Sequence, residues 1–518
     1  MLTRGPNFQT VPLNVVGSST FGRYPKISIE KTYNMFQSDT ALVPYSGYQV
    51  AISADNFGSA LEGRGIYAST KLNRIVVVQG SGVYLVNINY QHSDDTVTSF
   101  QVAKIGTLST QTGVVYIAEN NKPQIGISDG TSFYLYDPQL STTFQTIALN
   151  FKPGYLTFHD TYFILAASND ATYSPVVNNT WRLSEANDGT SWPSTASYVG
   201  LLQTKPDDTQ AVVRVPSRGN MIFVMGKNVT EAWFDTGAQS LFPYQRNTQF
   251  NIDYGCMNPA TVAYMDSLVV WLARNGDSGP IILASNGGEP KKITTDGIDY
   301  LLATLQYPED AQGYLYRQDG HLFYHINFYR DNLSFFYDFN TDKIYQASDH
   351  QMNYFIAAQV AFFKNQYYFV SRNNGCLYAL DTTITTYDDV DSLGAVTQVQ
   401  IPRIRICKNI RAVNQSYSII NDLGLTIESG QTPYVQQISP DGTDSGDGDL
   451  SLPRVDLSIS RDGGATFGNS IGQYLRAIGL RKNKLMFWRL GVANDAVVQL
   501  RFWSWGRVVV FDGEVNVR

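Results

Sequence analysis

Short runs of alternating or β-branched apolar residues, separated by Gly, Asn or Asp, recur along the chain. Each run has the length of a strand, and the residues between runs favour tight turns. The clearest runs are 74–78 with 83–88, 124–128 with 133–136, 162–166, 221–225 with 229–234, 268–273 with 280–284, 322–328 with 333–339, and 367–370 with 376–380. This pattern predicts an all-β protein built from hairpins.

The hairpin units start roughly 40–60 residues apart, which is the period of four-stranded propeller blades. Between residues 56 and 390 the spacing predicts a β-propeller of six or seven blades. Residues 391–518 alternate apolar and polar positions differently and predict an additional C-terminal β-sandwich-like platform domain. Residues 1–55 hold no blade-like hairpin, so we expect an N-terminal arm whose strands pair with the platform domain. A multi-sheet sandwich in place of the propeller is the alternative.

The composition favours strands and large interfaces. Of the 518 residues 43% are hydrophobic and only 16% are charged, with 33 Tyr and 27 Phe. Both aromatic types suit half-buried strands, and Tyr is common at protein interfaces. The three cysteines, Cys256, Cys376 and Cys407, form no CxxC pair, which argues against a disulfide framework and a zinc site.

The charge is unevenly distributed along the chain. Residues 1–400 carry 24 Lys+Arg and 34 Asp+Glu, a net −10, whereas residues 401–518 carry 14 and 11, a net +3. A sequence-reading DNA-binding domain is usually strongly basic, whereas an acidic body would let DNA slide past without sticking. The chain has neither a membrane segment nor the apolar core of a signal peptide, so we expect synthesis in a cytoplasm.

One short motif stands out near the C-terminus. The residues SRDGGATF match the Asp-box pattern S-x-D-x-G-x-T-[FW], a hairpin turn whose polar side chains bond the loop backbone. Its defined positions are Ser460, Asp462, Gly464, Thr466 and Phe467. The motif resembles the Asp-boxes of sialidase propellers, which lie far from the catalytic centre. We therefore interpret it as a structural turn.

Basic residues of the C-terminal segment lie among apolar and aromatic positions. They are either ordinary strand exteriors or a basic face that docks onto an acidic partner ring or borders the DNA path. The residues concerned are Arg476, Arg481, Lys482, Lys484, Arg489, Arg501 and Arg507.

No pattern in the chain indicates a catalytic site. His321 and His325 occupy a predicted strand, where residues four apart lie about 13 Å from each other, too far to share a metal. The acidic loop with Asp441, Asp444, Asp447 and Asp449 misses the spacing of a calcium-binding EF-hand. The chain has no P-loop, GxSxG, HExxH or Rossmann glycine pattern. We expect no catalytic residue, no cofactor and no metal, and hence no enzyme.

Four stretches spread over nearly the whole chain carry a family resemblance. They are 29–38 (IEKTYNMFQS), 63–65 (GRG) leading into 74–86, 218–238 (RGNMIFVMGKNVTEAWFDTGA), and 459–469 (ISRDGGATFGN) followed by RLG at 489–491. Together they resemble the phage packaged DNA stabilisation proteins, the tail accessory hub of short-tailed P22-like phages, and the nozzle proteins of T7-like phages. This family is structural and supplies no catalytic residues.

The resemblance implies a virion tail protein, assembled in the host bacterial cytoplasm. It implies a ring, a homohexamer, below the portal and adaptor (head-to-tail) proteins. Such a ring would close or extend the DNA channel, retain the packaged genome and receive tail fibre, spike or needle proteins. DNA would pass without sequence-specific binding. The alternatives are a carbohydrate-active β-propeller, sialidase-like or a tail depolymerase, and a monomeric propeller that binds protein partners.

Overall fold

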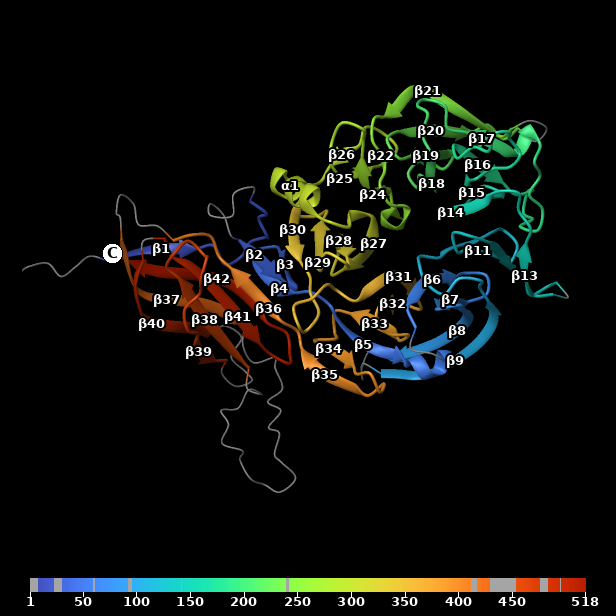
Figure 1. Ribbon diagram of the computed structural model, residues 1–518. Coiled ribbons are helices and arrows are strands. Elements are labelled where there is room, and N and C mark those ends of the chain that lie inside the picture. The colour runs from blue at the N-terminus through green and yellow to red at the C-terminus, as the bar shows by residue number, and fades with distance from the viewer. Residues whose placement is uncertain are drawn as a thin grey trace, which may run out of the picture.

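The computed structural model describes residues 8–22, 30–58, 61–91, 96–140, 142–238, 242–410, 417–428, 453–475, 483–493 and 495–518. In these ranges the chain is almost entirely β-structure, and a ring of small sheets lies beside a pair of larger packed sheets (Figure 1). The all-β fold class is confirmed. Short helical elements of the described ranges are α1 (Asp296–Thr304), η1 (Ala54–Phe57), η2 (Ala196–Tyr198), η3 (Pro259–Thr261) and η4 (Pro308–Asp310).

Seven sheets of the described chain stand around one axis and form the propeller. The first four are four-stranded and antiparallel, with strands in chain order. Blade 1 comprises β6 (Gly63–Ser69), β7 (Arg74–Gln79), β8 (Gly82–Gln91) and β9 (Thr96–Thr107), and blade 2 comprises β10 (Tyr116–Glu119), β11 (Ile125–Ser128), β12 (Phe133–Tyr136) and β13 (Phe144–Ile147). Blade 3 comprises β14 (Lys152–His159), β15 (Tyr162–Ser168), β16 (Thr180–Leu183) and β17 (Val199–Leu201), and blade 4 comprises β18 (Thr209–Arg214), β19 (Met221–Gly226), β20 (Thr230–Asp235) and β21 (Tyr244–Ile252).

The last three blades depart from this simple pattern. Blade 5 contains β22 (Gly255–Cys256), β23 (Ala263–Met265), β24 (Leu268–Arg274), β25 (Ile281–Ser285) and β26 (Lys291–Lys292), and blade 6 contains β27 (Ala311–Gln318), β28 (His321–Phe328), β29 (Leu333–Asp338) and β30 (Lys343–Gln346). Blade 7 contains β31 (Ala357–Phe363), β32 (Gln366–Ser371), β33 (Leu377–Asp381), β5 (Gly47–Ile52), β34 (Thr386–Val390) and β35 (Val396–Gln400). The prediction of six or seven blades therefore resolves to seven.

Asn and Asp residues make many of the turns within these blades. Asn73, Asp160, Asp319 and Asp342 lie between consecutive strands and take φ angles of 50°, 56°, 47° and 53°. Asn and Asp tolerate this left-handed conformation better than most other residues that carry a β-carbon. The polar separators of the sequence are therefore the residues that reverse the chain.

A strand from near the N-terminus closes the ring of blades. β5 pairs antiparallel with β33, and Tyr48 lies opposite Leu380. Tyr48 also stacks on Tyr387 of β34, with ring centroids 4.1 Å apart. We expected the strands of residues 1–55 to pair with the C-terminal domain. β5 instead joins blade 7, because Tyr48 is buried among the aromatic residues of that blade. Beside this closure the inner strands of blades 7 and 1, β31 and β6, contact each other.

Two packed sheets form the C-terminal sandwich. One contains β1 (Gln9–Leu13), β3 (Met35–Ser38), β4 (Ala41–Pro44), β42 (Val509–Val517), β37 (Ser418–Glu428) and β40 (Asn483–Ala493). The other contains β2 (Lys31–Tyr33), β36 (Arg403–Ile406), β41 (Val497–Trp503), β38 (Arg454–Ser460) and β39 (Ile471–Tyr474). The sandwich core is mainly Leu, Val and Ile, with side chains from both sheets.

The N-terminal strands join the sandwich to the propeller. β1 pairs with β42, and β2 pairs with β36. β2 also pairs with β30 of blade 6 through Tyr33 and Gln346, so the second sheet of the sandwich continues into the propeller. The exact domain boundaries stay a prediction.

Candidate functional site

Buried polar side chains hold the sandwich on the propeller. Asn34 donates to Ser348 Oγ at 3.0 Å and to the carbonyl of Pro402 at 2.9 Å. Arg403 of β36 is fully buried and donates to the carbonyl of Thr385 at 3.1 Å. Burial lowers the pKa of the Arg403 guanidinium to about 10. Because Ser348 follows blade 6 and Thr385 precedes β34, these bonds fix the position of the sandwich relative to both blades.

A second buried arginine, Arg405, ties the N-terminal segment to the sandwich. Its guanidinium donates to Glu30 Oε2 at 2.8 Å and to the carbonyls of Asn14 and Ser18 at 2.8 and 2.9 Å. Both side chains of the Arg405–Glu30 pair are buried. Removing one partner of such a pair leaves an unpaired charge in the interior, which is costly. The pair therefore holds the N-terminal segment in place against the sandwich.

The Asp-box motif forms a turn directly after β38. Ser460 Oγ donates to Asp462 Oδ1 at 2.6 Å and accepts from the Gly464 amide at 2.7 Å. Asp462 accepts from the Thr466 amide at 3.0 Å and from Thr466 Oγ1 at 2.7 Å. These hydrogen bonds, the Ser460 contact first, hold the pKa of the Asp462 carboxyl far below its usual value. Phe467 packs against the apolar side chains of β36 and β41.

The basic residues singled out in the sequence do not gather on one strand. Lys484 and Arg489 lie on β40, and Lys484 pairs with Glu514. Arg501 lies on β41 of the other sheet, with its guanidinium 3.9 Å from the ring centre of Trp503, and Arg507 is exposed before β42. Arg476, Arg481 and Lys482 lie outside the described residues. A single basic face formed by all seven stays a prediction.

An exposed apolar surface of the sandwich was not anticipated. We call it the sandwich patch, and it consists of Tyr417, Ile419, Trp488 and Val492 with Arg461 and Arg489. Ile419 of β37 lies directly opposite Val492 of β40, and Trp488 is 59% exposed. The neighbouring residues Ile420, Phe487 and Ala493 point into the core, so the apolar side chains of the patch point away from it.

Two arginines flank the apolar part of the sandwich patch. Arg489 is exposed between Trp488 and the buried Leu490. The Asp-box turn places the guanidinium of Arg461 against the backbone of Gly491 on β40. Neither arginine pairs with a carboxylate among the residues that the structure describes. β40 is also an edge strand, because within those residues only β37 pairs with it.

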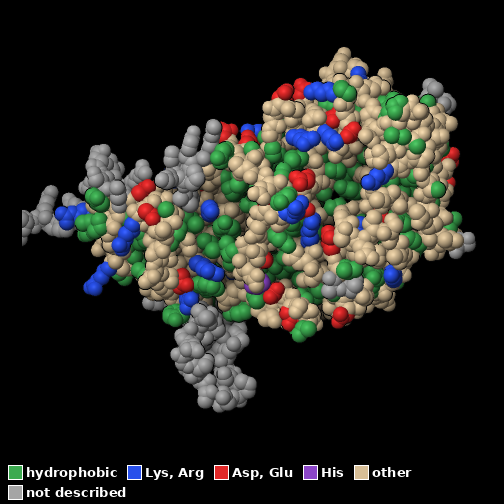
Figure 2. Space-filling model, in the orientation of Figure 1, with side chains coloured by type: hydrophobic (Ala, Val, Ile, Leu, Met, Phe, Trp, Pro, Cys, Tyr) green, Lys and Arg blue, Asp and Glu red, His purple; other side chains and the backbone are tan. Residues whose placement is uncertain are grey.

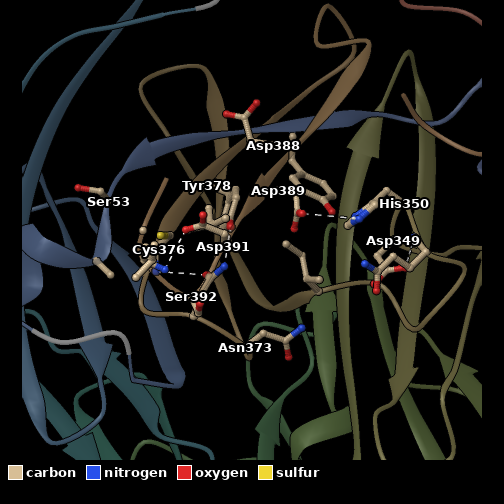
Figure 3. A pocket seen from close by; sticks show the side chains of 18 of the residues that line it. Ser53, Asp349, His350, Asn373, Cys376, Tyr378, Asp388, Asp389, Asp391 and Ser392 are labelled. Atoms are coloured by element: carbon tan, nitrogen blue, oxygen red, sulfur yellow. Dashed lines mark hydrogen bonds and ion pairs between the residues drawn. The ribbon is translucent and has the colours of Figure 1, made fainter. Parts of the chain in front are cut away.

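A pocket of about 560 Å³ opens beside blade 7. Figure 3 shows Asp389 and His350 next to each other in the pocket lining, with their Oδ2 and Nε2 atoms 3.6 Å apart. Asp388 Oδ2 accepts from the Val50 amide at 2.8 Å, and burial raises the pKa of the Asp388 carboxyl. No Lys or Arg is among the described residues that line the pocket. Its acidic residues are Asp55, Asp349, Asp388, Asp389 and Asp391.

The rim of this pocket is a protruding hairpin. We call it the blade 7 hairpin, and it consists of β34, β35 and the turn 391–395. Asp391 Oδ1 accepts from the amides of Leu393 and Ala395 at 2.8 and 2.9 Å, which shapes the turn. Leu393 at its tip is 91% exposed, and Val396 is exposed at the start of β35. β35 is an edge strand of blade 7 in the described structure.

Tyrosine and arginine side chains from the inner strands meet near the propeller axis. The rings of Tyr116 and Tyr155, from blades 2 and 3, have centroids 4.9 Å apart. The guanidinium of Arg214 in blade 4 lies 4.7 Å from the ring centre of Tyr264 in blade 5. Burial raises the pKa of Tyr67 in blade 1, with Tyr264 raising it further and Arg214 opposing the shift. Side chains of neighbouring blades therefore contact each other along the inner strands.

The two histidines of the strand-like sequence DGHLFYHINFY have structural partners. His321 Nδ1 lies 2.9 Å from Asp338 Oδ2. His325 lies between Tyr45 Oη at 2.7 Å and Asn327 Oδ1 at 2.9 Å, and burial lowers its pKa to about 3. Within the described ranges no group of His, Cys, Asp or Glu is placed to hold a metal ion. The acidic loop with Asp441 lies outside the described residues.

The propeller of this chain matches a known family. Residues 60–385 match the family model described as Bacteriophage P22 Gp10, beta-propeller. The chain therefore belongs to this phage stabilisation family, and the resemblance drawn from the sequence is confirmed. No curated protein matches the chain. No helix of the described ranges is long and apolar enough to cross a membrane.

Several solved structures are similar to this chain at low identity. The N-terminal domain of Nup159 is 10% identical and covers 68% of this chain and 98% of its own, with a TM-score of 0.39. Virginiamycin B lyase from Staphylococcus aureus is 10% identical over 65% of this chain and 99% of its own, with a TM-score of 0.42. An exo-beta-1,3-galactanase from Phanerochaete chrysosporium is 9% identical over 89% and 100%, with a TM-score of 0.28. With scores this low, these likenesses carry no argument about fold or function.

Proposed function

We propose that this protein is a structural component of a bacteriophage tail that assembles with copies of itself into a ring, a hexamer. The ring lies below the portal and adaptor proteins, extends or closes the DNA channel and retains the packaged genome. The family match over residues 60–385 carries this proposal. The closed propeller, joined through β2 to an open-edged sandwich, supports it because the sandwich leaves an apolar surface for a neighbouring subunit.

The DNA path of this proposal is the axis of the ring and not the axis of a propeller. Tyr116 contacts Tyr155 between blades 2 and 3, and Arg214 contacts Tyr264 between blades 4 and 5, so bulky side chains occupy the inner strands of these blades. A net charge of −10 on residues 1–400 favours a ring wall that repels the phosphate backbone. DNA then moves through the channel without sequence-specific contacts.

A non-enzymatic role fits the pocket beside blade 7. A carbohydrate-active propeller would need carboxylates together with an arginine cluster, and the described lining contains only the carboxylates. We assign the Asp-box turn a structural role, because its hydrogen bonds are internal to the turn. The proposed location is the virion tail, assembled in the host cytoplasm, with fibre, spike or needle proteins as further partners.

Solution mass and head binding test the proposal together. The full chain is measured alone and after mixing with virion heads that lack their tails. Rings, or chains that bind the heads and stop DNA leakage, are the expected result. A stable monomer that does not bind the heads and that shortens a host surface polysaccharide would overturn the proposal in favour of an enzyme.

A further inference from the structure

Two exposed surfaces of this chain complement each other. The sandwich patch presents Trp488, Val492 and Ile419 with Arg461 and Arg489. The blade 7 hairpin presents the exposed Leu393 and Val396, with the carboxylates of Asp389 and Asp391 beside them. Figure 2 shows blue Lys and Arg side chains over the sandwich on the left, and red acidic side chains around the purple histidine at the lower centre.

We propose that the sandwich patch of one copy docks on the blade 7 hairpin of the next copy. This inference rests on the proposed ring function and names the two surfaces that build the ring. Trp, Tyr and Arg are the residue types enriched at the energetic centres of protein interfaces, and the sandwich patch contains all three. Leu393 and Val396 supply the apolar contact on the receiving side, and Asp389 and Asp391 supply charge opposite to that of the arginines.

The charges select this pairing over a contact between two identical patches. If two sandwich patches met around a two-fold axis, Arg461 and Arg489 would face their own copies. Like charges brought together at an interface cost affinity, whereas arginines facing carboxylates do not. The same reasoning disfavours two blade 7 hairpins meeting, because Asp389 and Asp391 would then face each other.

A contact between two different surfaces can build a ring. Each copy then has one donor surface and one acceptor surface, and successive copies close into a ring when the rotation between them closes after a whole number of copies; otherwise they form an open helical filament. The sandwich patch and the blade 7 hairpin lie on the two sides of the junction held by Asn34, Arg403 and Arg405. This junction therefore sets the angle between the surfaces, and with it the number of copies in the ring.

Two variants separate the surfaces in the full chain. The patch variant carries Trp488→Ala and Arg489→Glu, and the hairpin variant carries Asp389→Lys and Leu393→Ser. Loss of such central contacts weakens association by about 30-fold or more, so each variant alone is expected to stay monomeric. Mixed together they are expected to form a particle of two chains and nothing larger, because one intact surface of each kind remains.

The mass of each sample, measured with and without tailless heads, decides the proposal. Val176→Asp and Lys122→Glu, at exposed propeller positions, serve as matched controls that should assemble like the wild type. If the hairpin variant alone dimerises, the patch pairs with itself and the proposal is wrong. If both variants form wild-type rings, these surfaces face another tail protein or solvent. A wild-type chain that neither assembles nor binds heads would instead remove the proposed function itself.

Discussion

The propeller and the sandwich differ in the side chains that fill their cores and in how their sheets are closed. Blades 6 and 7 pack aromatic rings, such as Tyr48 stacked on Tyr387 at 4.1 Å, whereas the sandwich core is mainly aliphatic. The propeller closes into a ring through β5, so each of its sheets has neighbouring sheets, while in the described structure the sandwich ends at the edge strands β39 and β40. Free edges are available to a partner, and outside the ring closure the blades also keep such edges at their outer strands, as β35 shows.

This difference assigns separate tasks to the two regions. The propeller is complete within one chain, because its last blade takes a strand from near the N-terminus. The sandwich exposes Trp488 on its edge strand β40, which a self-sufficient domain usually avoids. The comparison therefore predicts that substitutions in the propeller core act on folding, and that substitutions in the sandwich patch and in the exposed blade 7 hairpin act on association.

The largest effect is expected where the two regions join. Arg405→Met leaves the buried Glu30 carboxylate without its partner, which should lower the free energy of unfolding by about 3–5 kcal/mol. Denaturant titration with a probe in the sandwich measures the loss. The double variant Arg405→Met with Glu30→Leu should lose less, because no unpaired charge remains. A single variant as stable as the wild type would contradict a junction held by this pair.

Acid should weaken the propeller through a buried histidine. His325 has a pKa of about 3 when folded, against about 6.5 when unfolded, so below pH 6.5 the unfolded chain binds a proton that the folded chain does not. The contribution of the neutral His325 to the free energy of unfolding is therefore fully present above pH 6.5, and it is lost progressively as the pH falls toward 3. The slope is about 1.4 kcal/mol per pH unit for this group.

Denaturant midpoints between pH 7.5 and 4.5 test this histidine. His325→Gln should reduce the slope below pH 6.5. Some slope should persist, because burial also lowers the pKa of His159 in blade 3. Above pH 7 the wild type should show no dependence on this group, since neither state binds the proton there. An unchanged slope in the variant would show that His325 does not titrate as its burial requires.

Local patterns in the sequence predicted more than long-range ones did. The hairpin period predicted the propeller, because each turn depends on a few residues such as Asn73 and Asp160. The number of blades stayed open between six and seven for two structural reasons. The fourth strand of blade 7 comes from the distant β5, and the innermost strand of blade 5 is divided between β22 and β23.

The same contrast holds for the candidate site. The positions of the Asp-box turn could be named because all its bonds lie within eight residues. The sandwich patch could not, because it needs the pairing of β37 with β40. The sequence does carry one signal for it. Alternation along β40 directs Leu485 and Phe487 inward, which leaves Trp488 facing outward.

A smaller effect on folding is expected at the Asp-box turn. Ser460 is fully buried, and its hydroxyl both donates to Asp462 and accepts from the Gly464 amide. Ser460→Ala should cost about 0.5–1.5 kcal/mol, because the turn loses hydrogen bonds that water can partly replace at the exposed Asp462. Chemical denaturation measures the change. Thr466→Ser keeps a hydroxyl at the other end of the turn and should remain close to the wild type, and an equal loss in both would show that the hydroxyls are not what matters.

The smallest effect on folding is expected at the most exposed tryptophan of the two regions, and a pair of identical substitutions exposes the contrast. Trp271→Ala empties a fully buried position in blade 5 and should cost about 3–5 kcal/mol. Trp488→Ala removes the same side chain from the face of the sandwich and should change stability by no more than about 0.5 kcal/mol. Thermal and denaturant unfolding of both variants as monomers provide the comparison. If Trp488→Ala were as destabilising as Trp271→Ala, the sandwich patch would be part of the core, and its exposure would need no partner to explain it.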